Sequence, residues 1–419
     1  MILIDKSYIC VDLKSFYASV ECVERGLDPF KVNLVVADPT RKGAITLAAT
    51  PAIKKLGVPS RGRVFEIPDN IEYIIASPRM SLYMQYAAKI YSIFLKYIAS
   101  EDIHVYSIDE SFMDVTPYLK LYNMNAKQIA KMIIDDIYKQ TGITATVGIG
   151  PNLFLTKVAL DIEAKHAADN MGYLDEDLFK QKLWYHRPIT DFWMIGPGTA
   201  RRLETLGIYD MHGIAVCKEA LLYKLFGINA EYLIDHAKGK EPVTISDIKE
   251  HKPKSNSISN SQILFEDYNY RDAYVVMCEM VDANVLVLTQ KHLVTNRISL
   301  YVGYSKDVIR PSRGSVKITN TTNSYRLLLE EFKILYKKIV VPNYPIRQIA
   351  IGFGNVVDEC YEQLDLFANV EDVEKEKMLQ EALVSIRDKY GKNAALKGMS
   401  YLDKATMRMR NGLIGGHNA

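Results

Sequence analysis

Three features of the sequence predict an α+β protein of several domains. Up to about residue 185, short runs of strand-forming residues alternate with longer amphipathic helical patterns, as in a single α+β domain. Residues 188–242 read as helices separated by glycines, and residues 258–355 read as a separate β-α-β-β-α-β domain. A chain of 419 residues is long enough for two to four domains with cores of their own.

The composition excludes several classes of protein. Apolar residues make up 48% and charged residues 24%, so a wholly disordered chain is excluded. Lys and Arg total 52 against 50 Asp and Glu, so a nucleic acid would have to bind a local basic surface. We expect no membrane span and no signal peptide, and five cysteines without a C-x-x-C pair favour a reducing cytoplasm.

Three carboxylates stand at the ends of predicted strands. Asp12 ends a strand predicted over 8–13, and Asp109 and Glu110 form the turn of a hairpin predicted over 104–115. If these strands are neighbours, the three side chains meet at one sheet edge, where hard oxygen ligands can hold two Mg²⁺ ions. Such a pair of ions stabilises both the attacking and the leaving oxygen of phosphoryl transfer. Any one carboxylate could simply cap a turn, but the set favours a metal site.

Two segments around these carboxylates resemble a known family. Residues 11–21, VDLKSFYASVE, and residues 106–111, YSIDES, are similar to the two metal-binding motifs of Y-family translesion DNA polymerases. The first motif is closest to the UmuC-like bacterial branch, and the resemblance extends to about residue 355. It implies a right-hand polymerase fold and template-directed, low-fidelity DNA synthesis past damaged bases. Asp114 lies outside the motifs, and we expect a surface or structural role for it.

The resemblance also divides the chain into parts. The implied parts are a catalytic palm over 1–25 and 78–187, fingers over 26–77, a helix-hairpin-helix thumb over 188–242, a linker over 243–257, a little finger over 258–355, and a tail over 356–419 with a clamp-binding motif. Small residues in the fingers, namely Gly43, Ala44, Ala48 and Ala49, are expected to leave an open roof above the templating base.

For the metals and the sugar, the resemblance implies roles position by position. Asp12, Asp109 and Glu110 are the implied catalytic ligands of two Mg²⁺ ions, and the backbone carbonyl of Leu13 is a further metal ligand. The aromatic pair of Phe16 and Tyr17 would lie beneath the sugar of the incoming dNTP, where Tyr17 would collide with a ribose 2′-OH. Without the resemblance, packing in a helix core would be the better explanation for this pair.

Positive charge is needed near the triphosphate, because the leaving pyrophosphate gains negative charge. The resemblance implies Lys54 and Lys165 as its ligands. Pro51 stands where some relatives have a tyrosine, so Lys55 remains an alternative to Lys54. Lys165 comes one residue later than the spacing usual in the family, so Lys157 remains an alternative to it. For each lysine, a solvated helix face is the simpler explanation.

Two regions are candidates for gripping DNA. The run IGPGTARRL over 195–203 reads as a helix-hairpin-helix element, whose glycines let backbone amides approach a phosphate. Between 295 and 326 there are six basic side chains and one acidic side chain, enough for an electrostatic stripe along a duplex. A plain turn and solubilising charge are the alternatives. The implied DNA contacts are Gly196, Gly198, Thr199, Arg201, Arg297, Arg310, Arg313 and Lys317.

The pentapeptide QLDLF over 363–367 resembles the motif by which bacterial polymerases bind the sliding clamp. Its residues are Gln363, Leu364, Asp365, Leu366 and Phe367. A helix start is the alternative. The expected partners are primer–template DNA, dNTP and the clamp, with no membrane. The need for a UmuD-like accessory protein or a recombinase filament, and the role of residues 370–419, are left open.

Two other functions compete with a DNA-directed DNA polymerase. A two-metal nuclease or nucleotidyl cyclase shares the carboxylate site, but it needs no sugar gate, thumb and distal basic domain on one chain. A catalytically inactive DNA-binding or regulatory relative would be expected to lack a carboxylate, whereas all three are present here. We therefore predict a translesion polymerase.

Overall fold

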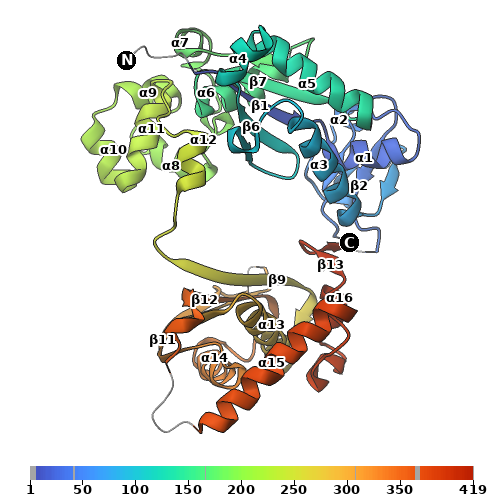
Figure 1. Cartoon of the computed structure of the whole chain (residues 1–419), viewed down its shortest axis with the longest axis vertical. Helices are drawn as coiled ribbons and strands as arrows, with labels where there is room; N and C mark the ends of the chain where they lie inside the picture. The colour runs from blue at the N-terminus through green and yellow to red at the C-terminus, as the bar shows by residue number, and fades with distance from the viewer. Residues whose placement is uncertain (1–5, 41–42, 166, 307, 364–368, 419) are drawn as a thin grey trace. The chain divides into compact units, whose positions relative to one another are not determined.

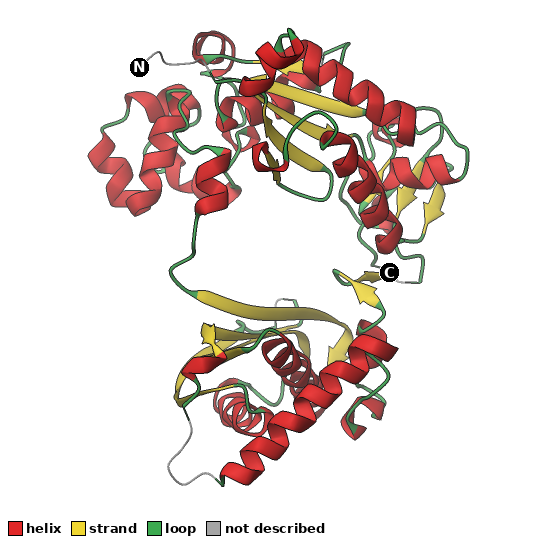
Figure 2. Cartoon of the chain, viewed as in Figure 1, coloured by secondary structure: helices red, strands yellow, loops and turns green. Residues whose placement is uncertain are grey.

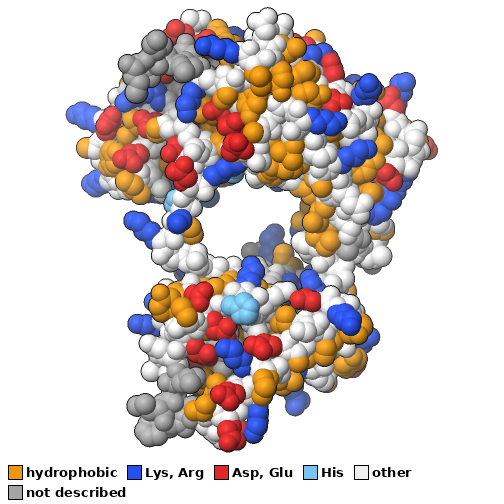
Figure 3. Space-filling view, viewed as in Figure 1, with side chains coloured by type: hydrophobic (Ala, Val, Ile, Leu, Met, Phe, Trp, Pro, Cys, Tyr) orange, Lys and Arg blue, Asp and Glu red, His pale blue; other side chains and the backbone are white. Residues whose placement is uncertain are grey.

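The computed structural model describes residues 6–40, 43–165, 167–306, 308–363 and 369–418 (Figure 1). The chain divides into two compact units, one ending at His251 and one running from Lys252 to Asn418, and each is described by itself. Basic and acidic side chains are mixed over the face in Figure 3, in keeping with the net charge of +2. None of the described helices is long and apolar enough to cross a membrane.

A five-stranded sheet forms the centre of the first unit (Figure 2). Its order is β5-β6-β1-β7-β8, with β1 at Tyr8–Leu13, β5 at Ile103–Val105, β6 at Glu110–Asp114, β7 at Ala145–Gly150 and β8 at Met171–Tyr173. Strand β1 pairs antiparallel with both β6 and β7. Nearly every side chain of β1 and β7 is buried, which explains why both strands read as short apolar runs.

Helices α5 (Ala126–Thr141) and α6 (Leu153–Val158) and a π-helical turn (Ala159–Ala164) pack against this sheet. The first unit also contains α1 (Phe16–Glu24), α3 (Met80–Phe94), α4 (Thr116–Tyr122) and α7 (Glu176–Leu183). Ile129, Ile133 and Ile137 of α5 are fully buried at helical spacing. A Cβ on Gly148 of β7 would lie 2.1 Å from the carbonyl of Thr156, so α6 can approach this closely only over a glycine.

Residues 26–77 fold into a small three-stranded sheet with one helix, as predicted. Its elements are β2 (Leu34–Val36), β3 (Ala48–Ala49), α2 (Pro51–Lys55) and β4 (Ile74–Ala76). Three of the small residues expected to leave an open roof above the templating base, Ala44, Ala48 and Ala49, are buried, at 6%, 9% and 0% exposed. A sheet this small needs such side chains for its own core, where Ala49 packs with Val35 and Ile53.

The predicted helical region shares a hydrophobic core with α6 and α7, and it is followed by a further helix. Its helices are α8 (Pro197–Glu204), α9 (Met211–Val216), α10 (Glu219–Phe226) and α11 (Ala230–Ala237). The interpretation of 243–257 as a linker is wrong in part, because α12 occupies Ile245–Glu250. Ile245 is buried against Tyr8 and Phe112 of the central sheet. Two isoleucines three residues apart, Ile245 and Ile248, anchor an otherwise polar helix here.

The second unit has a four-stranded antiparallel sheet and the predicted β-α-β-β-α-β order. The sheet order is β11-β10-β12-β9. The elements are β9 (Asn256–Tyr268), α13 (Tyr270–Gln290), β10 (Leu293–Tyr304), β11 (Ser312–Thr322), α14 (Tyr325–Ile339) and β12 (Ile346–Asp358). The two helices and the inner sides of the strands form one hydrophobic core.

The C-terminal residues pack onto this second unit. They form α15 (Val370–Tyr390), α16 (Met407–Arg410) and a hairpin of β13 (Leu413–Ile414) and β14 (His417–Asn418). Two buried carboxylates of α13 hold them. Glu279 accepts the backbone N–H of Thr406 at 2.7 Å, and Asp282 pairs with Arg387 at 3.3 Å and Lys397 at 3.0 Å. Residues 370–418, for which the sequence suggested no core, therefore pack on α13.

Candidate active site

Strand pairing brings the three predicted carboxylates together at one end of β1. In the antiparallel register of β1 and β6, Asp12 lies directly opposite Glu110. The backbone N–H of Leu13 donates to the carbonyl of Asp109 at 2.9 Å, so the turn lies against the end of β1. The neighbouring strand contributes Thr146, whose hydroxyl donates to the Asp12 carbonyl at 3.3 Å.

The electrostatics at this edge disfavour three bare carboxylates. Burial raises the pKa of Asp12 to about 7, and the negative charges of Asp109 and Glu110 add to the effect. The ammonium groups of Lys157 and Lys165 act in the opposite direction, but they do not outweigh the first two causes. The site therefore stores mutual repulsion that an added cation would relieve.

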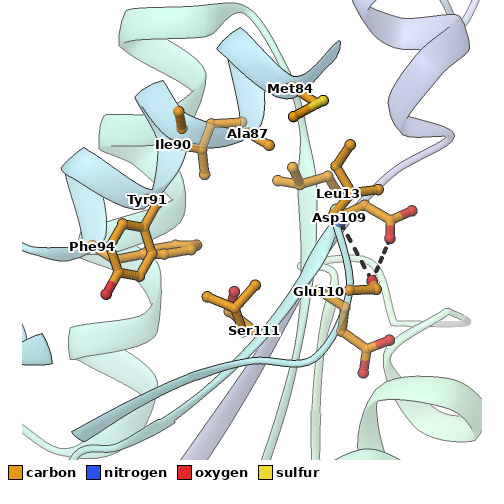
Figure 4. A pocket seen from close by; sticks show the side chains of 13 residues that line it. Leu13, Met84, Ala87, Ile90, Tyr91, Phe94, Asp109, Glu110 and Ser111 are labelled. Carbon is orange, nitrogen blue, oxygen red and sulfur yellow. Dashed lines mark hydrogen bonds between the residues drawn. The ribbon is translucent and has the colours of Figure 1, made fainter. Parts of the chain in front are cut away.

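Each of the two hairpin carboxylates has a local partner. Glu110 forms an ion pair with Lys157 at 2.9 Å and accepts from the Cys10 thiol at 3.2 Å. Asp109 accepts from the Ser107 hydroxyl at 2.6 Å. In Figure 4 both carboxylates lie on the side of the hairpin away from Tyr91 and Phe94. Among the described residues, no three acidic, cysteine or histidine side chains are gathered closely enough to form a ready metal cluster.

Lys157 of α6 and Lys165, which directly follows the π-helical turn, have different surroundings. Lys157 is 7% exposed and bonded to both Glu110 and Asp161, whose charges raise its pKa despite burial. Lys165 is half-exposed and forms an ion pair with Asp161 at 3.3 Å. The π-helical turn Ala159–Ala164 lies between the lysines and takes up one residue more than an α-helical turn. That turn explains how Lys165, one residue beyond the usual spacing, still influences Asp12.

Lys54 reaches the same edge from the small sheet domain. Its Nζ donates to the Ser15 hydroxyl at 2.8 Å, and Ser15 itself has a left-handed backbone with φ of 48°. Burial lowers the pKa of Lys54, and the charge of Asp12 partly restores it while Lys165 lowers it further. Lys54 and Lys165 are thus close enough to Asp12 and to each other to interact, whereas Lys55 is exposed.

Tyr17 lies on a rigid support at the start of α1. Its ring stacks on that of Tyr83 with centroids 4.5 Å apart and an interplanar angle of 16°. The Tyr83 hydroxyl donates to Glu21 at 2.7 Å, and Arg79 donates two hydrogen bonds to the same carboxylate. Burial would raise the pKa of Glu21, but the hydrogen bonds from Arg79, Tyr83 and Arg25 outweigh it and lower the pKa. Tyr17 is only partly buried.

Next to the carboxylates lies an apolar pocket between α3 and the hairpin. Its walls include Met84, Tyr91 and Phe94 of α3 (Figure 4). Asp109 and Glu110 lie at its edge, at the junction of an apolar surface and a charged one. Phe16, the neighbour of Tyr17, is 3% exposed and packs in the interior, as its helical-core alternative suggested.

The predicted phosphate-binding turn is open to solvent. Gly196 is the residue before α8, and a Cβ at Gly196 or at Gly198 would meet nothing within 4 Å. Arg201 is exposed one turn further along the same helix, and Thr199 is partly buried. The turn is therefore accessible to a large partner.

In the second unit, three of the predicted basic residues share one face of the sheet. Arg297 of β10 is the cross-strand partner of Lys317 of β11, and Arg313 is the partner of Tyr301. Since residues two or four apart on a strand point to the same side, Arg297, Arg313 and Lys317 lie on the face opposite the helices. Arg310 lies in the exposed connection between these strands.

Little of the predicted clamp motif can be placed. The backbone N–H of Gln363 donates to the Thr321 carbonyl at 2.8 Å, at the end of β11. Leu364, Asp365, Leu366 and Phe367 lie outside the described residues.

Comparisons with known proteins identify the family. Residues 11–161 match the model of the impB/mucB/samB family, and residues 255–366 match that of its C-terminal domain. The putative UV-damage repair protein UvrX of Bacillus subtilis (strain 168) is 34% identical over 423 residues, covering 99% of this chain and 98% of the relative. The chain belongs to the Y family of translesion DNA polymerases, in its UmuC-like bacterial branch. DNA polymerase IV 2 of the same organism is 29% identical, covering 99% of each protein.

The fold of this Y-family chain agrees with a solved structure. A chimera of the Y-family DNA polymerases Dbh and Dpo4 superimposes with a TM-score of 0.65 at 22% identity, covering 84% of this chain and 99% of the chimera. This similarity confirms the predicted polymerase fold with its separate C-terminal β-α-β-β-α-β domain.

Y-family polymerases generally depend on divalent metal ions, and the donor set of this member fits such ions. Asp12, Asp109 and Glu110 supply hard oxygen ligands, which Mg²⁺ prefers. Burial, together with the charges of Asp109 and Glu110, raises the pKa of Asp12, and a divalent cation would favour its ionised form. The donor chemistry therefore suits a metal, although Lys157 now holds Glu110.

Sequence reasoning missed the residues that support the site. Lys157 was an alternative triphosphate ligand, but it is the buried charge partner of Glu110. Glu21 and Arg79 were not considered at all. One signal was available: Glu21 follows Tyr17 at helical spacing and lies on the apolar side of the helix, where a carboxylate needs partners.

Proposed function

We propose that this Y-family polymerase extends a primer by template-directed transfer of a nucleotide from dNTP to the primer 3′-OH, releasing pyrophosphate. Asp12, Asp109, Glu110 and the carbonyl of Leu13 would hold two Mg²⁺ ions. When bound, such ions supply charge stabilisation for the attacking and the leaving oxygen. The observation that carries the proposal is the register that places Asp12 opposite Glu110, with Asp109 bonded to the next residue of β1.

Lys54 and Lys165 are the proposed ligands of the triphosphate. Both lie near Asp12, and neither is buried in an ion pair with a metal-ligand candidate. Lys157 has the opposite properties, since it is buried and bonded to Glu110, so its proposed role is to hold that carboxylate in its orientation. Positive charge from Lys54 and Lys165 would grow in value as the leaving group gains negative charge.

Tyr17 is the proposed sugar gate, with Phe16 packed beside it. The stack on Tyr83 supports this role, because a gate has to hold its place when a ribose 2′-OH presses against it. A steric gate of this kind selects deoxyribonucleotides by collision rather than by a hydrogen bond.

DNA would be held at two surfaces. The first is the turn of Gly196, Gly198, Thr199 and Arg201, whose backbone is open to a phosphate. The second is the basic sheet face of the second unit, with Arg297, Arg313 and Lys317, together with Arg310 in the connection between β10 and β11. Both surfaces suit contacts to the backbone, which position a duplex without reading its sequence.

Further partners follow from the family and the sequence. We propose the bacterial sliding clamp as the partner of residues 363–367. A UmuD-like accessory protein and a recombinase filament remain candidates with no observation in favour of either. The name of the relative UvrX refers to the repair of UV damage, so a UV-damaged template is the substrate we propose to test first. Work on chromosomal DNA would place the enzyme in the cytoplasm.

Primer extension tests this function directly. We expect the protein to extend a primer on undamaged and UV-irradiated templates with Mg²⁺, and to stop when EDTA is added. Asp109→Ala with Glu110→Ala should abolish extension. The matched control is Asp114→Asn, in the same strand as Glu110, which should extend like the unchanged protein.

The competing functions give different results in the same assay. A two-metal nuclease would shorten the primer, and a cyclase would consume nucleotide without a template. An inactive DNA-binding relative would bind the primer–template without extending it. Any of these results from the unchanged protein would refute the polymerase proposal.

A further inference from the structure

Trp193 lies between two hydrophobic cores of the first unit. Its ring packs against the core of the helical region and also against the cluster beneath the central sheet, which includes Phe112. The next residue, Met194, has a left-handed backbone with φ of 67°, a costly conformation for a bulky side chain. After it, Ile195 turns into the helical core and is 4% exposed. The left-handed backbone at Met194 thus lets the Trp193 side chain extend beyond the helical region while Ile195 stays in the core.

The Trp193 side chain contacts Tyr106, which lies three residues before the turn of Asp109 and Glu110. Its indole N–H donates to the Tyr106 hydroxyl at 3.0 Å, and the two rings meet edge to face with centroids 6.0 Å apart. The backbone N–H of Tyr106 donates to the Glu110 carbonyl at 2.9 Å. Lys157, the charge partner of Glu110, lies 5.9 Å from the Tyr106 ring. Tyr106 therefore contacts both the backbone of Glu110 and the lysine that holds its carboxylate.

The other end of the connection is the open turn before α8. Gly196 follows Trp193 by three residues, and the backbone between them is fixed by the buried Ile195. A phosphate bound at this turn would hold Gly196 and Gly198 in place, and hence the residues just before them. Displacement of the turn and displacement of the Trp193 ring are in this way linked through a short stretch of backbone.

We propose that Trp193 is a positioning residue that couples duplex DNA held at the turn to the placement of the catalytic hairpin. The inference rests on the proposed polymerase function and assigns to it a residue outside the metal and nucleotide contacts. The hydrogen bond to Tyr106 carries the coupling, because it joins the two regions through a directional contact. Small misplacements of catalytic groups cost large factors in rate, so a modest contact can matter.

The test compares three single variants, each of which removes one hydrogen-bond group, either a tyrosine hydroxyl or a tryptophan indole N–H. Tyr106→Phe and Trp193→Phe both delete the hydrogen bond between the two regions. Trp184→Phe is the matched control, because the Trp184 N–H donates to Ala237 within the helical region, at 2.7 Å. Single-turnover incorporation at saturating dNTP and primer–template is measured together with the dissociation constant for DNA.

We expect Tyr106→Phe and Trp193→Phe each to slow incorporation by about three- to thirtyfold, the range of coupling through packed networks. The double variant should be no slower than the slower single variant, since both changes delete one contact. DNA affinity should change less than twofold or so. Trp184→Phe should lose similar thermal stability but keep its incorporation rate.

A second measurement needs no catalysis. The chain has two tryptophans, so Trp184→Phe leaves Trp193 as the only one. In that background, primer–template without nucleotide should shift the tryptophan emission, and adding Tyr106→Phe should change the starting emission and reduce the shift. Tyr106→Phe loses only a hydroxyl from a half-exposed ring and should fold even if Trp193→Phe does not.

Three results would overturn the coupling in a protein that extends primers normally. They are an unchanged incorporation rate in Tyr106→Phe, an equal slowing in Trp184→Phe, and additive effects in the double variant. Failure of the unchanged protein to extend any primer would instead refute the proposed function, so the two failures are distinguishable.

Discussion

Two buried acidic sites lie within the first two dozen residues of the chain, and they are built in opposite ways. At Glu21, three cationic or hydroxyl groups point at one carboxylate, and their hydrogen bonds lower its pKa. At Asp12, carboxylates face one another, and burial together with their repulsion raises the pKa of Asp12 to about 7. The first arrangement is satisfied by the protein itself, and the second leaves charge that an external cation can neutralise.

The difference separates structural from functional acids. Glu21 is completely buried and stabilises the fold by joining α1 to Arg79 and Tyr83 at the start of α3. At Asp12, burial and the neighbouring carboxylates disfavour the ionised form, and such an environment is typical of groups that bind or catalyse. The number of charged residues nearby in the sequence would not distinguish the two acids, because Asp12 lies among apolar residues of β1 and Glu21 among apolar residues of α1.

The largest expected effect comes from removing a charge at the repelling site. Asp12→Asn should lower single-nucleotide incorporation about a thousandfold, because loss of a metal ligand removes several kcal/mol of transition-state stabilisation. The same variant should be more stable in EDTA than the unchanged protein, by about 1–3 kcal/mol, because a buried repelling charge is gone. Primer extension and urea unfolding in EDTA measure the two effects. A variant that loses activity and stability together would contradict the assignment of Asp12 as a functional acid.

At Glu21, replacing the acid by its amide should destabilise the protein, the reverse of the effect on stability expected at Asp12. Glu21→Gln should lower the free energy of unfolding by about 2–4 kcal/mol, because it leaves Arg25 and Arg79 without their buried partner. The lowered pKa of Glu21 means that its contribution is present above the ordinary pKa of 4.5 and is lost as the pH falls through the folded-state value. The difference between the two proteins should therefore shrink from pH 7 to below pH 4.

Glu24→Gln is the matched control for this measurement. Glu24 lies on the same helix, is exposed, and accepts a hydrogen bond from the Tyr86 hydroxyl at 2.7 Å. We expect Glu24→Gln to lower the free energy of unfolding by less than about 0.5 kcal/mol. An equal loss of stability from Glu24→Gln would show that the helix, and not the buried ion cluster, is the source of the effect.

The two sites also differ in how far the sequence predicted them. The motifs around Asp12 and Asp109 were readable because alternating strands and a family resemblance carry them. The cluster of Glu21 with Arg79 joins residues 58 positions apart, and nothing local in the sequence indicates such a pairing. The fold was largely predictable, since strand and helix periods repeat over short segments.

Where prediction failed, long-range packing decided the outcome. The burial of the β3 alanines was not predicted, because nothing local in the sequence shows that a small sheet uses them as core. The helix α12 was missed because its polar residues resemble those of a linker and its anchor, Ile245, contacts a strand more than 200 residues earlier. The docking of α15 on α13 depends on Asp282 and that of α16 on Glu279, and both acids read as ordinary helix-surface acids.

The smallest expected effect is at Tyr83, which contacts both Glu21 and the ring of Tyr17. Tyr83→Phe keeps the ring that stacks on Tyr17 but deletes the hydroxyl that donates to Glu21. We expect a loss of about 1 kcal/mol in unfolding free energy, because Arg79 and Arg25 still satisfy the carboxylate. Discrimination between dNTP and rNTP, measured as the ratio of incorporation efficiencies, should stay within about twofold.

Removal of the gate itself supplies the contrast. Tyr17→Ala should admit ribonucleotides at least about tenfold better, because the collision with the 2′-OH disappears. If Tyr83→Phe relaxed sugar discrimination as much as Tyr17→Ala does, the hydroxyl contact to Glu21 would be setting the position of the gate. The satisfied acid would then belong to the active site, and the separation of structural from functional acids would fail at this residue.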